Sequence, residues 1–327
     1  MPRVLVTPIM LHNIDGPYRE ILGQGGFEVV YPPAGIPLKD PRVLAAQLKG
    51  IDAVIASMEP YNHEVLADAD LRVIARNGVG YDTVDVAAAT ERGVVVAITP
   101  GVNQDSVAEH AIALMLAAAH GYPGRQTEAC SGVWKRKPLP RLGGKTLGLL
   151  GLGAIGRAVV PRAIGLGMNV IAHDPVPDGD FARRHGVRLC SFDELLAEAD
   201  VVSLHLPCTP ETTDVIDAAS LGKMKPGSIL VNTGRGGLVD EDALADTLRS
   251  GHLAAAALDV FKVEPLPADS PLANMDNVVA CPHMGGIDRE ALAGMAQLAA
   301  ENIVELHQGR WPEGRVVNEE IRAAWKW

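Results

Sequence analysis

Short apolar runs alternate along the chain with longer segments that have the polarity pattern of helices. Near the N-terminus the runs are RVLVT, FEVVY, DAVIA and LRVIA, and each is followed by a polar or Ala/Leu-rich segment. A second series of the same kind begins at Lys145 and continues to about Gly286. Strands that alternate with helices are typical of βαβ units, which form parallel sheets covered on both faces. The pattern therefore predicts an α/β protein with two domains, each built on a doubly wound parallel sheet.

Two helical segments indicate where one domain ends and the other begins. Residues 104–120 form a long predicted helix between the turn-rich stretches TPGVN and GYPG, which places a boundary at residues 99–101. A last helix, within DREALAGMAQLAAENIVELHQG, has no strand of its own and can pack back on the first series. We therefore expect a discontinuous first domain of residues 1–100 and 288–327, and a second domain of residues 101–287.

Composition and charge narrow the class of partner. The chain has 327 residues, of which 47% are hydrophobic, and a formal net charge of -11. This acidic balance provides no general basic field for nucleic acid or an anionic membrane. The N-terminal apolar run is too short for a signal peptide, and no stretch approaches the ~18 apolar residues of a membrane helix. We expect a soluble, cytoplasmic protein whose partner is a small molecule, with no nucleic-acid or membrane partner.

The cysteines indicate neither a metal centre nor a disulfide scaffold. They lie far apart in the sequence and form no C-x-x-C pair, so we expect reduced thiols and no bound metal. The four positions are Cys130, Cys190, Cys208 and Cys281.

The segment KTLGLLGLGAIGRAVV contains a glycine motif between a predicted strand and a predicted helix. Gly151, Gly153 and Gly156 form a G-x-G-x-x-G pattern, which alone is weak evidence in a chain with 34 glycines. In this context the glycines permit a tight turn and a close backbone approach. The helix start at Ala154 and Ile155 offers N–H groups to a pyrophosphate. The second domain is therefore predicted to bind a dinucleotide, and both domains to be Rossmann-like.

Asp174 closes the next predicted strand, NVIAHD, where a carboxylate can bind the 2′-hydroxyl of the adenosine ribose. A negative charge at this place repels a 2′-phosphate, so NAD is favoured over NADP as the cofactor. Arg183 and Arg184 keep NADP open as the alternative. Pro161, inside the preceding helix, removes a helical hydrogen bond and is expected to kink the axis.

Three strands of the second series, which resemble buried strands, are each followed by a polar side chain. The strands cover residues 229–232, 255–260 and 278–280, and the side chains beyond them are Arg235, Glu264 and His283. Taken one at a time, each has a simpler interpretation. Arg235 can be a surface ion-pair partner, Glu264 a solvated loop charge, and His283 a capped core residue. Jointly they form a reaction centre, because parallel strands bind ligands outside their carboxyl ends. An arginine holds a carboxylate, a histidine transfers a proton, and a carboxylate orients and charges that histidine.

Several motifs resemble those of the D-isomer-specific 2-hydroxyacid dehydrogenases, a group with D-3-phosphoglycerate dehydrogenase and glyoxylate/hydroxypyruvate reductase. The motifs occur in family order over nearly the whole chain: RNGVGYDTVD, SVAEHAIALML, GLGAIG, HLPCTPET, MKPGSILVNTGRGGLVDEDAL, ALDVFKVEPLP and PHMGG. The resemblance implies that Arg235 anchors the substrate carboxylate and keto oxygen, that His283 is the acid/base, and that Glu264 is its partner.

The resemblance also implies further contacts and an assembly state. A homodimer is expected, formed partly by residues 106–144. The implied substrate-binding residues, besides Arg235, are Asn77, Gly78, Val79 and Gly80, so the first domain is expected to bind substrate and the second, residues 101–287, to bind NAD. The implied cofactor contacts beyond the glycine motif are Asp174, Leu206, Pro207, Thr212, Thr233, Gly234, Asp259, His283 and Gly285.

The expected function is hydride transfer between NAD(H) and a small D-2-hydroxy or 2-keto acid. An NAD(H)-sensing, corepressor-like binding protein of the same fold is the alternative, although no disordered or basic extension supports it. Formate dehydrogenase chemistry is disfavoured by Glu264, because family members with that activity have a glutamine in place of this glutamate.

Whether the substrate is phosphorylated stays open. Ser57, Met58 and Glu59 stand where many phosphoglycerate dehydrogenases have an arginine, but other cations can supply a phosphate site: Arg76, Lys135, Arg136 and Lys137.

Overall fold

The computed structural model describes residues 1–12, 15–136 and 138–327. The chain divides into two units: unit 1 comprises Met1–Asn103 and Ile287–Trp327, and unit 2 comprises Gln104–Gly286. Lys137, one of the cations considered for a phosphate site, lies outside the described residues. Among those residues, no helix combines the length and the hydrophobicity needed to cross a membrane.

Unit 1 contains a parallel sheet, which has five strands within the described residues. The strands are β1 (Arg3–Val6), β2 (Glu28–Val30), β3 (Ala53–Ala56), β4 (Val73–Arg76) and β5 (Val95–Ala97). They are ordered β2-β1-β3-β4-β5, so that the chain direction across the sheet reverses between β1 and β3. Strands β3, β4 and β5 are buried along their whole length, as expected for a sheet covered on both faces.

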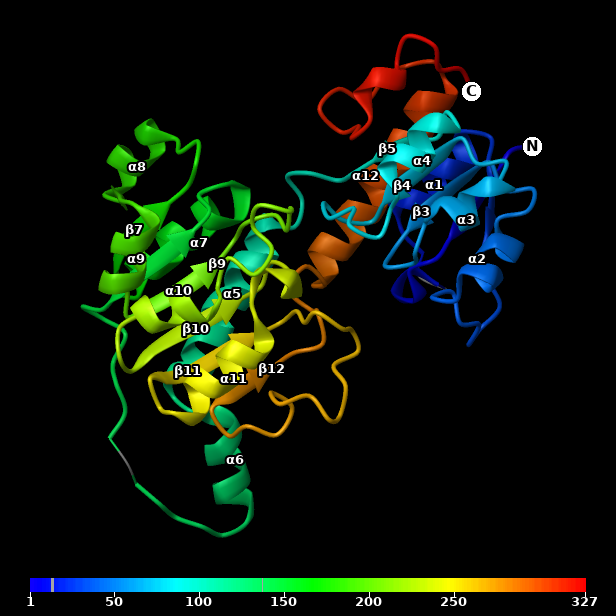
Figure 1. The fold of residues 1–327 in the computed structure, drawn as a ribbon. Helices are drawn as coiled ribbons and strands as arrows, with labels where there is room; N and C mark the ends of the chain where they lie inside the picture. The colour runs from blue at the N-terminus through cyan, green and yellow to red at the C-terminus, as the bar shows by residue number, and fades with distance from the viewer. Residues whose placement is uncertain (13–14, 137) are drawn as a thin grey trace. The chain divides into compact units, whose positions relative to one another are not determined.

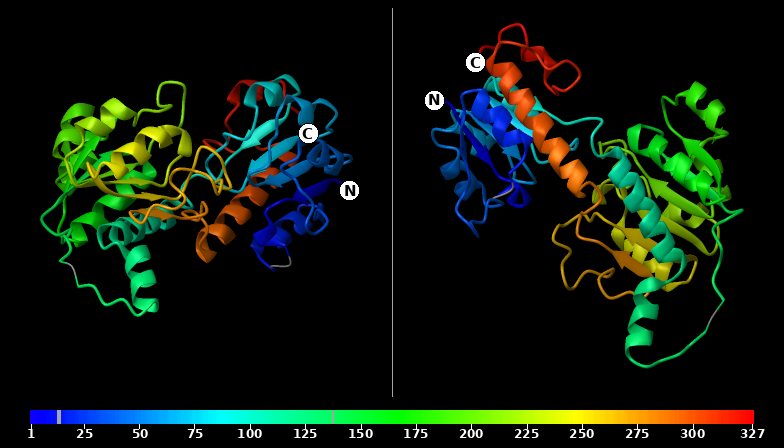
Figure 2. Two further views of the ribbon diagram at one scale, coloured as in Figure 1. Left: turned by 60° about the horizontal axis from the view of Figure 1, so that its bottom comes forward. Right: turned by 180° about the vertical axis from the view of Figure 1, so that it is seen from behind.

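The helices of unit 1 cover both faces of this sheet (Figure 1). Apolar residues of α1 and α12 pack on one face, and those of α2, α3 and α4 pack on the other. Figure 2 shows α12 as a long, straight helix. The helical elements are η1 (Ile9–Leu11), α1 (Pro17–Gln24), α2 (Pro41–Gln47), α3 (His63–Ala67), α4 (Val86–Glu91), α12 (Arg289–His307) and η3 (Glu319–Ile321).

Unit 2 contains a second parallel sheet, in which the described residues form seven strands in the order β12-β11-β10-β9-β6-β7-β8. The chain direction across the sheet reverses between β6 and β9, which is the Rossmann topology. The strands are β6 (Thr146–Leu150), β7 (Asn169–His173), β8 (Arg188–Leu189), β9 (Val201–Leu204), β10 (Ser228–Asn232), β11 (Leu253–Leu258) and β12 (Val278–Ala280).

Two apolar cores lie on opposite faces of the seven-stranded sheet. Residues of α5, α7 and α8 contribute to one core, and residues of α9, α10 and α11 contribute to the other. The helical elements are α5 (Gln104–Ala119), α6 (Tyr122–Cys130), α7 (Ala154–Gly165), α8 (Gly179–His185), α9 (Phe192–Glu198), α10 (Ala218–Lys223), η2 (Gly236–Leu238) and α11 (Glu241–Arg249). The prediction of two Rossmann-like domains with doubly wound parallel sheets is confirmed.

Several local predictions differ from the structure. β11 ends at Leu258, so Asp259 is the first residue beyond the strand and not part of it. β12 was predicted to be buried, but it is the edge strand, and Ala280 at its end is exposed. The turn-rich GYPG segment begins α6, because proline is well tolerated in the first turn of a helix. α7 runs from Ala154 to Gly165 with the exposed Pro161 inside it, and the kink expected there stays a prediction.

Candidate active site

The glycine motif occupies the reversal point of the unit 2 sheet, between β6 and β9. Gly151 has a φ of 98°, and a Cβ there would lie 2.5 Å from the His205 carbonyl oxygen. A Cβ at Gly156 would lie 2.2 Å from the Gly151 carbonyl oxygen, so α7 starts against this turn only with glycine. A Cβ at Gly153 would meet no atom within 4 Å. The first and third glycines therefore close the turn, and the second leaves room for a ligand.

The start of α7 has the properties of an anion-binding helix end. Gly153 is its N-cap, and no side chain caps the first N–H groups, which belong to Ala154, Ile155 and the residues that follow. Asp174 lies beside this turn: its Oδ2 accepts a hydrogen bond of 2.7 Å from the Leu152 N–H, and its Oδ1 accepts one of 2.8 Å from Val176. The carboxylate is thus held at the edge of the glycine turn, as a ribose ligand requires.

Two polar atoms near this turn fit a bound dinucleotide. Thr233 follows β10, and its buried Oγ1 has no hydrogen-bond partner among the described residues. The Nδ1 atom of His205, which follows β9, is buried and likewise has no partner in the described part of the chain. Burial lowers the pKa of His205 to about 4, so its imidazole is neutral at physiological pH. A buried polar group without a partner costs free energy, and a ligand's donors and acceptors can satisfy it. The site therefore fits NAD.

The remaining predicted cofactor residues of this region follow the same two strands. Thr212 Oγ1 donates a hydrogen bond of 2.7 Å to the Pro207 carbonyl oxygen and closes the loop after β9. Leu206 lies against the glycine turn, within 3.2 Å of the Cβ position at Gly151. Gly234 follows Thr233, and its N–H donates to Asn232 Oδ1 at 3.0 Å.

Arg235 is positioned by the buried side chain of Asn232, the last residue of β10. The Asn232 amide group accepts from the Gly234 N–H and donates through Nδ2 to the Arg235 carbonyl oxygen at 2.8 Å. The Arg235 Nη1 atom donates a hydrogen bond of 2.7 Å to the Gly234 carbonyl oxygen. These bonds fix the backbone that carries the guanidinium group beyond the end of β10.

Gly236 brings the loop after β10 against the loop after β11. A Cβ at this position would lie 2.0 Å from the carbonyl carbon of Phe261 and 2.4 Å from the Lys262 nitrogen. No side chain fits in this space without moving backbone. The contact therefore holds Arg235 next to the segment that leads to Glu264.

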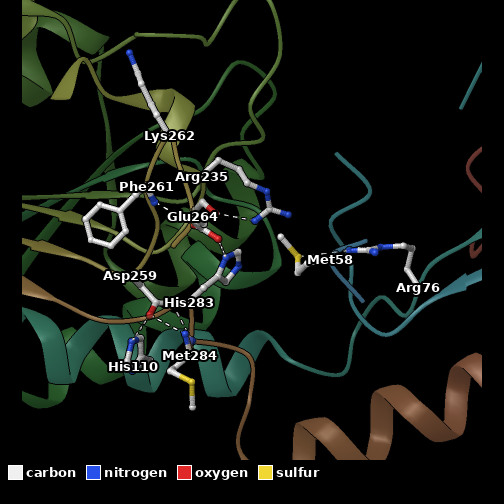
Figure 3. A network of polar contacts seen from close by, with 12 residues as sticks. Met58, Arg76, His110, Arg235, Asp259, Phe261, Lys262, Glu264, His283 and Met284 are labelled. Atoms are coloured by element: carbon white, nitrogen blue, oxygen red, sulfur yellow. Dashed lines mark hydrogen bonds and ion pairs between the residues drawn. The ribbon is translucent and has the colours of Figure 1, made fainter. Parts of the chain in front are cut away.

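Glu264 and His283 form a hydrogen-bonded pair. His283 Nδ1 lies 2.8 Å from Glu264 Oε2, and Oε1 of the same carboxylate accepts from the Phe261 N–H at 3.1 Å. The carboxylate is thus held at both oxygens and can orient the imidazole, so that Nε2 stays available for proton transfer. Figure 3 shows Arg235, Glu264 and His283 directed toward one region of unit 2. The three side chains predicted from the strand exits are brought together.

Asp259 fixes the backbone on both sides of His283. Its carbonyl oxygen accepts from the His283 N–H at 2.9 Å, and its carboxylate accepts from Met284 and Gly285 at 2.8 Å each. His283 has a φ of 57°, a left-handed conformation that is costly for a residue with a side chain. The hydrogen bonds to Asp259 hold this conformation and thereby aim the imidazole.

His110 completes the surroundings of Asp259 (Figure 3). It projects from α5, and its Nε2 lies 3.1 Å from Asp259 Oδ1. Burial raises the pKa of the Asp259 carboxyl, but the nearby His110 imidazole and the hydrogen bonds from the Met284 and Gly285 N–H groups outweigh this effect. The pKa of Asp259 is therefore lowered below its usual value.

The predicted substrate-binding residues Asn77, Gly78, Val79 and Gly80 lie in unit 1, directly after β4. The carbonyl oxygens of Gly78 and Gly80 are both held: Gly78 accepts from the Thr99 N–H at 3.1 Å, and Gly80 accepts from Arg76 Nε at 2.9 Å. Arg76 is only 4% exposed, so it supports this segment from within.

A buried carboxylate lies at the reversal point of the unit 1 sheet. Glu59 follows β3, and its Oε2 accepts hydrogen bonds from Thr7 Oγ1 at 2.9 Å and from the Ser57 N–H at 2.8 Å. Met58, beside it, accepts a weak hydrogen bond at its Sδ from Arg76 Nη2 at 3.8 Å. The loop after β3 therefore presents a thioether, while its carboxylate is turned inward.

The chain is similar to known dehydrogenases and reductases. Residues 112–285 match the family model for the NAD binding domain of D-isomer specific 2-hydroxyacid dehydrogenases. Over 259 residues the chain is 46% identical to the D-3-phosphoglycerate dehydrogenase of Archaeoglobus fulgidus, covering 78% of this chain and 49% of that protein. It is 40% identical to the glyoxylate reductase of Korarchaeum cryptofilum, covering 86% of each chain. The TT0316 protein of Thermus thermophilus has a similar structure, with a TM-score of 0.86, 40% identity, and coverage of 96% of this chain and 99% of that one.

The chain belongs to the D-isomer specific 2-hydroxyacid dehydrogenase family. The family, the Rossmann-like fold and the NAD-binding domain predicted from the glycine motif are thereby confirmed. The chain spans about half the length of the D-3-phosphoglycerate dehydrogenases that it matches.

Several residues that shape the site were not singled out from the sequence. Their sequence signals were present, since they lie within or next to the motifs SVAEHAIALML, HLPCTPET and MKPGSILVNTGRGG. A motif does not say which of its members reach the site, because that depends on contacts between distant segments. These residues are His110, His205, Asn232 and Gly236.

Proposed function

We propose that the protein is an NAD-dependent D-2-hydroxyacid dehydrogenase, which transfers hydride between NAD(H) and a small 2-hydroxy or 2-keto acid. The observation that carries this proposal is the hydrogen bond of 2.8 Å between His283 Nδ1 and Glu264 Oε2, next to Arg235 on an NAD-binding domain. In this proposal unit 2 binds the nucleotide, and residues 77–80 of unit 1 bind substrate.

NADH supplies the hydride when it is bound. In keto-acid reduction, protonated His283 donates a proton from Nε2 to the oxygen that becomes the hydroxyl group, and in the reverse direction the neutral imidazole accepts it. Glu264 holds Nδ1 and thereby keeps Nε2 directed at the reacting oxygen. Arg235 binds the substrate carboxylate and stabilises the negative charge that develops on the keto oxygen.

NAD is the proposed cofactor in preference to NADP. The Asp174 carboxylate already accepts hydrogen bonds from Leu152 and Val176 at the edge of the glycine turn. In that position it can accept from a ribose 2′-hydroxyl, and it repels a 2′-phosphate. Arg183 and Arg184 are the two arginines that kept NADP open as the alternative. Within α8, Arg183 pairs with the Asp180 carboxylate and Arg184 donates a hydrogen bond to the Asp180 carbonyl oxygen, which reduces their availability for a phosphate.

The physiological substrate is proposed to be a small, unphosphorylated 2-keto acid such as glyoxylate or hydroxypyruvate. Met58 and the inward-turned Glu59 supply no positive charge after β3, and the match to the glyoxylate reductase extends over most of both chains. A phosphorylated substrate such as 3-phosphoglycerate is the second candidate, favoured by the 46% identity to a D-3-phosphoglycerate dehydrogenase.

Steady-state assays of NADH oxidation with a panel of 2-keto acids test the function and the substrate class together. Glyoxylate and hydroxypyruvate are expected to give a higher kcat/KM than 3-phosphohydroxypyruvate. The reverse order would move the assignment to the phosphorylated substrate. No turnover with any member, together with tight NADH binding, would favour the alternative of an NAD(H)-sensing binding protein. The enzyme names of the relatives described above favour catalysis.

A homodimer in the cytoplasm is the proposed state of the protein. The segment between α6 and β6 exposes apolar side chains that a second copy can cover, among them Trp134, which is 75% exposed, and Val133, which is 39% exposed. Light scattering combined with size-exclusion chromatography tests the dimer. A Trp134→Ser variant is expected to shift the equilibrium toward the monomer.

A further inference from the structure

Three side chains with metal-binding atoms converge in unit 2, from segments that are distant in the sequence. Asp259 and Cys281 follow the paired residues Leu258 and Ala280, so they leave neighbouring parallel strands side by side. His110 projects toward them from α5, which packs against both strands. The spacing of these residues in the sequence gives no metal motif, because only the order of the strands brings them together.

The donor atoms lie close enough to share one ion. His110 Nε2 and Asp259 Oδ1 are 3.1 Å apart, and the donor atoms of all three side chains lie within 4.8 Å of one another. Zinc–ligand distances of about 2.0–2.3 Å place the donors of a tetrahedral site roughly 3.3–3.8 Å apart. Closing the site requires the side chains of Cys281 and His110 to rotate, and neither side chain is fully buried.

The chemistry of the donors selects the ion. A thiolate, an imidazole and a carboxylate suit Zn²⁺ and related thiophilic cations, whereas Mg²⁺ and Ca²⁺ prefer oxygen ligands. Three protein ligands leave a fourth tetrahedral position for water.

We propose that His110, Asp259 and Cys281 form a binding site for Zn²⁺ or a chemically similar thiophilic divalent cation. On binding, the Cys281 thiol loses its proton to solvent and forms a metal–sulfur bond, the neutral imidazole binds through Nε2, and the carboxylate binds through Oδ1. The oxidation states of the ion and the protein do not change.

Occupation of this site has a consequence for the loop that carries His283. Asp259 Oδ1, the atom nearest His110, also accepts the hydrogen bond from the Met284 N–H at 2.8 Å. An ion on this oxygen competes with that N–H for electron density and pulls the carboxylate toward α5. The left-handed backbone at His283 then loses part of its support, so the ion inhibits the enzyme; this second step rests on the proposed function.

Cobalt(II) titration of the nucleotide-free protein tests the binding site without any turnover. A thiolate ligand gives a sulfur-to-cobalt charge-transfer absorption in the near ultraviolet, which histidine or carboxylate sites elsewhere cannot produce. The expected result is one equivalent of this absorption in the wild type, its loss in Cys281→Ser, and its retention in the matched control Cys208→Ser. Cys208 is a half-buried thiol of the same unit. Zinc added afterwards is expected to displace the cobalt and remove the band.

The outcomes separate the two parts of the inference. Absence of the band in the wild type, or its persistence in Cys281→Ser, overturns the site. A His110→Ala variant that keeps full cobalt affinity overturns the assignment of the imidazole, for which a loss of about ten-fold or more is expected. Zinc binding without inhibition of keto-acid reduction overturns the effect on His283. Failure of turnover with all keto acids would concern the proposed function alone, because the cobalt absorption is measured without substrate.

Discussion

The imidazole Nδ1 of His283 lies 2.8 Å from Oε2 of Glu264, across a sequence separation of 19 residues. The pair forms because β11 and β12 are neighbours in the sheet and their carboxyl ends open on the same side. The second oxygen of Glu264 is held by the Phe261 N–H, so the carboxylate cannot rotate away without losing a hydrogen bond. This relationship makes Glu264 a positioning residue for His283, and it can be tested directly.

Replacement of Glu264 by glutamine keeps the shape of the side chain but removes its charge. We expect kcat for keto-acid reduction to fall about 10²-fold, because the imidazolium loses the carboxylate that stabilises and orients it. The KM for the keto acid and the Kd for NADH are expected to change little. Steady-state kinetics and fluorescence titration measure these quantities. A loss confined to KM would assign Glu264 to substrate binding instead.

Replacement of His283 by alanine removes the proton donor. We expect kcat to fall by about 10²–10⁴-fold, the usual contribution of general acid–base catalysis. The Kd for NADH is expected to stay within a few-fold of the wild type, because the imidazole is needed for proton transfer and contributes little to cofactor binding. Retained turnover would show that another group transfers the proton.

Replacement of Asp174 by serine tests the choice of cofactor. The variant removes the charge that repels a 2′-phosphate, so NADP is expected to improve as a cofactor while NAD binds more weakly. The ratio of kcat/KM for NAD and NADP is the measurement. Asp246→Ser, which replaces an exposed carboxylate on α11, is the control, and an equal change there would point to a general charge effect.

Replacement of Gly236 by alanine tests the contact between the loops after β10 and β11. The added Cβ would lie 2.0 Å from the Phe261 carbonyl carbon, so backbone must move and Arg235 shifts relative to Glu264. We expect a lower Tm and a lower kcat/KM. Gly165→Ala is the matched control, because a Cβ there meets no atom within 4 Å. Wild-type kinetics in Gly236→Ala would mean that the two loops need not touch.

Replacement of His205 by glutamine tests the effect of the buried imidazole on acid stability. Its pKa is about 4 in the folded protein, compared with about 6.5 in an unfolded chain. Protons therefore bind the unfolded state first, and the wild type loses stability as the pH falls from about 6.5 to about 4. The variant lacks this loss, so its Tm should decrease less over that range. His185→Gln, an exposed histidine of the same unit, should behave like the wild type.

Local patterns were sufficient for the fold class and the nucleotide loop. The alternation of apolar runs with helical segments predicts parallel βαβ units, since side-chain periodicity depends on neighbours in the chain. The glycine motif is equally local, because the turn it forms lies within a few residues. The positions of Arg235, Glu264 and His283 beyond their strands followed from the rule that parallel strands bind ligands at their carboxyl ends.

The contacts that give these residues their roles arise only from the tertiary structure. The order of the strands places Asp259 beside Cys281, and the packing of α5 brings His110 to both. The order of the sheet also makes β12 an edge strand, although its apolar sequence predicts a buried one. Such contacts join segments that are far apart in the chain, and their free energy depends on how complete faces of helices and sheets fit together. Periodicity along one segment therefore contains no information about the segment that packs against it. For this reason, only the tertiary structure shows the direction in which the His283 imidazole points.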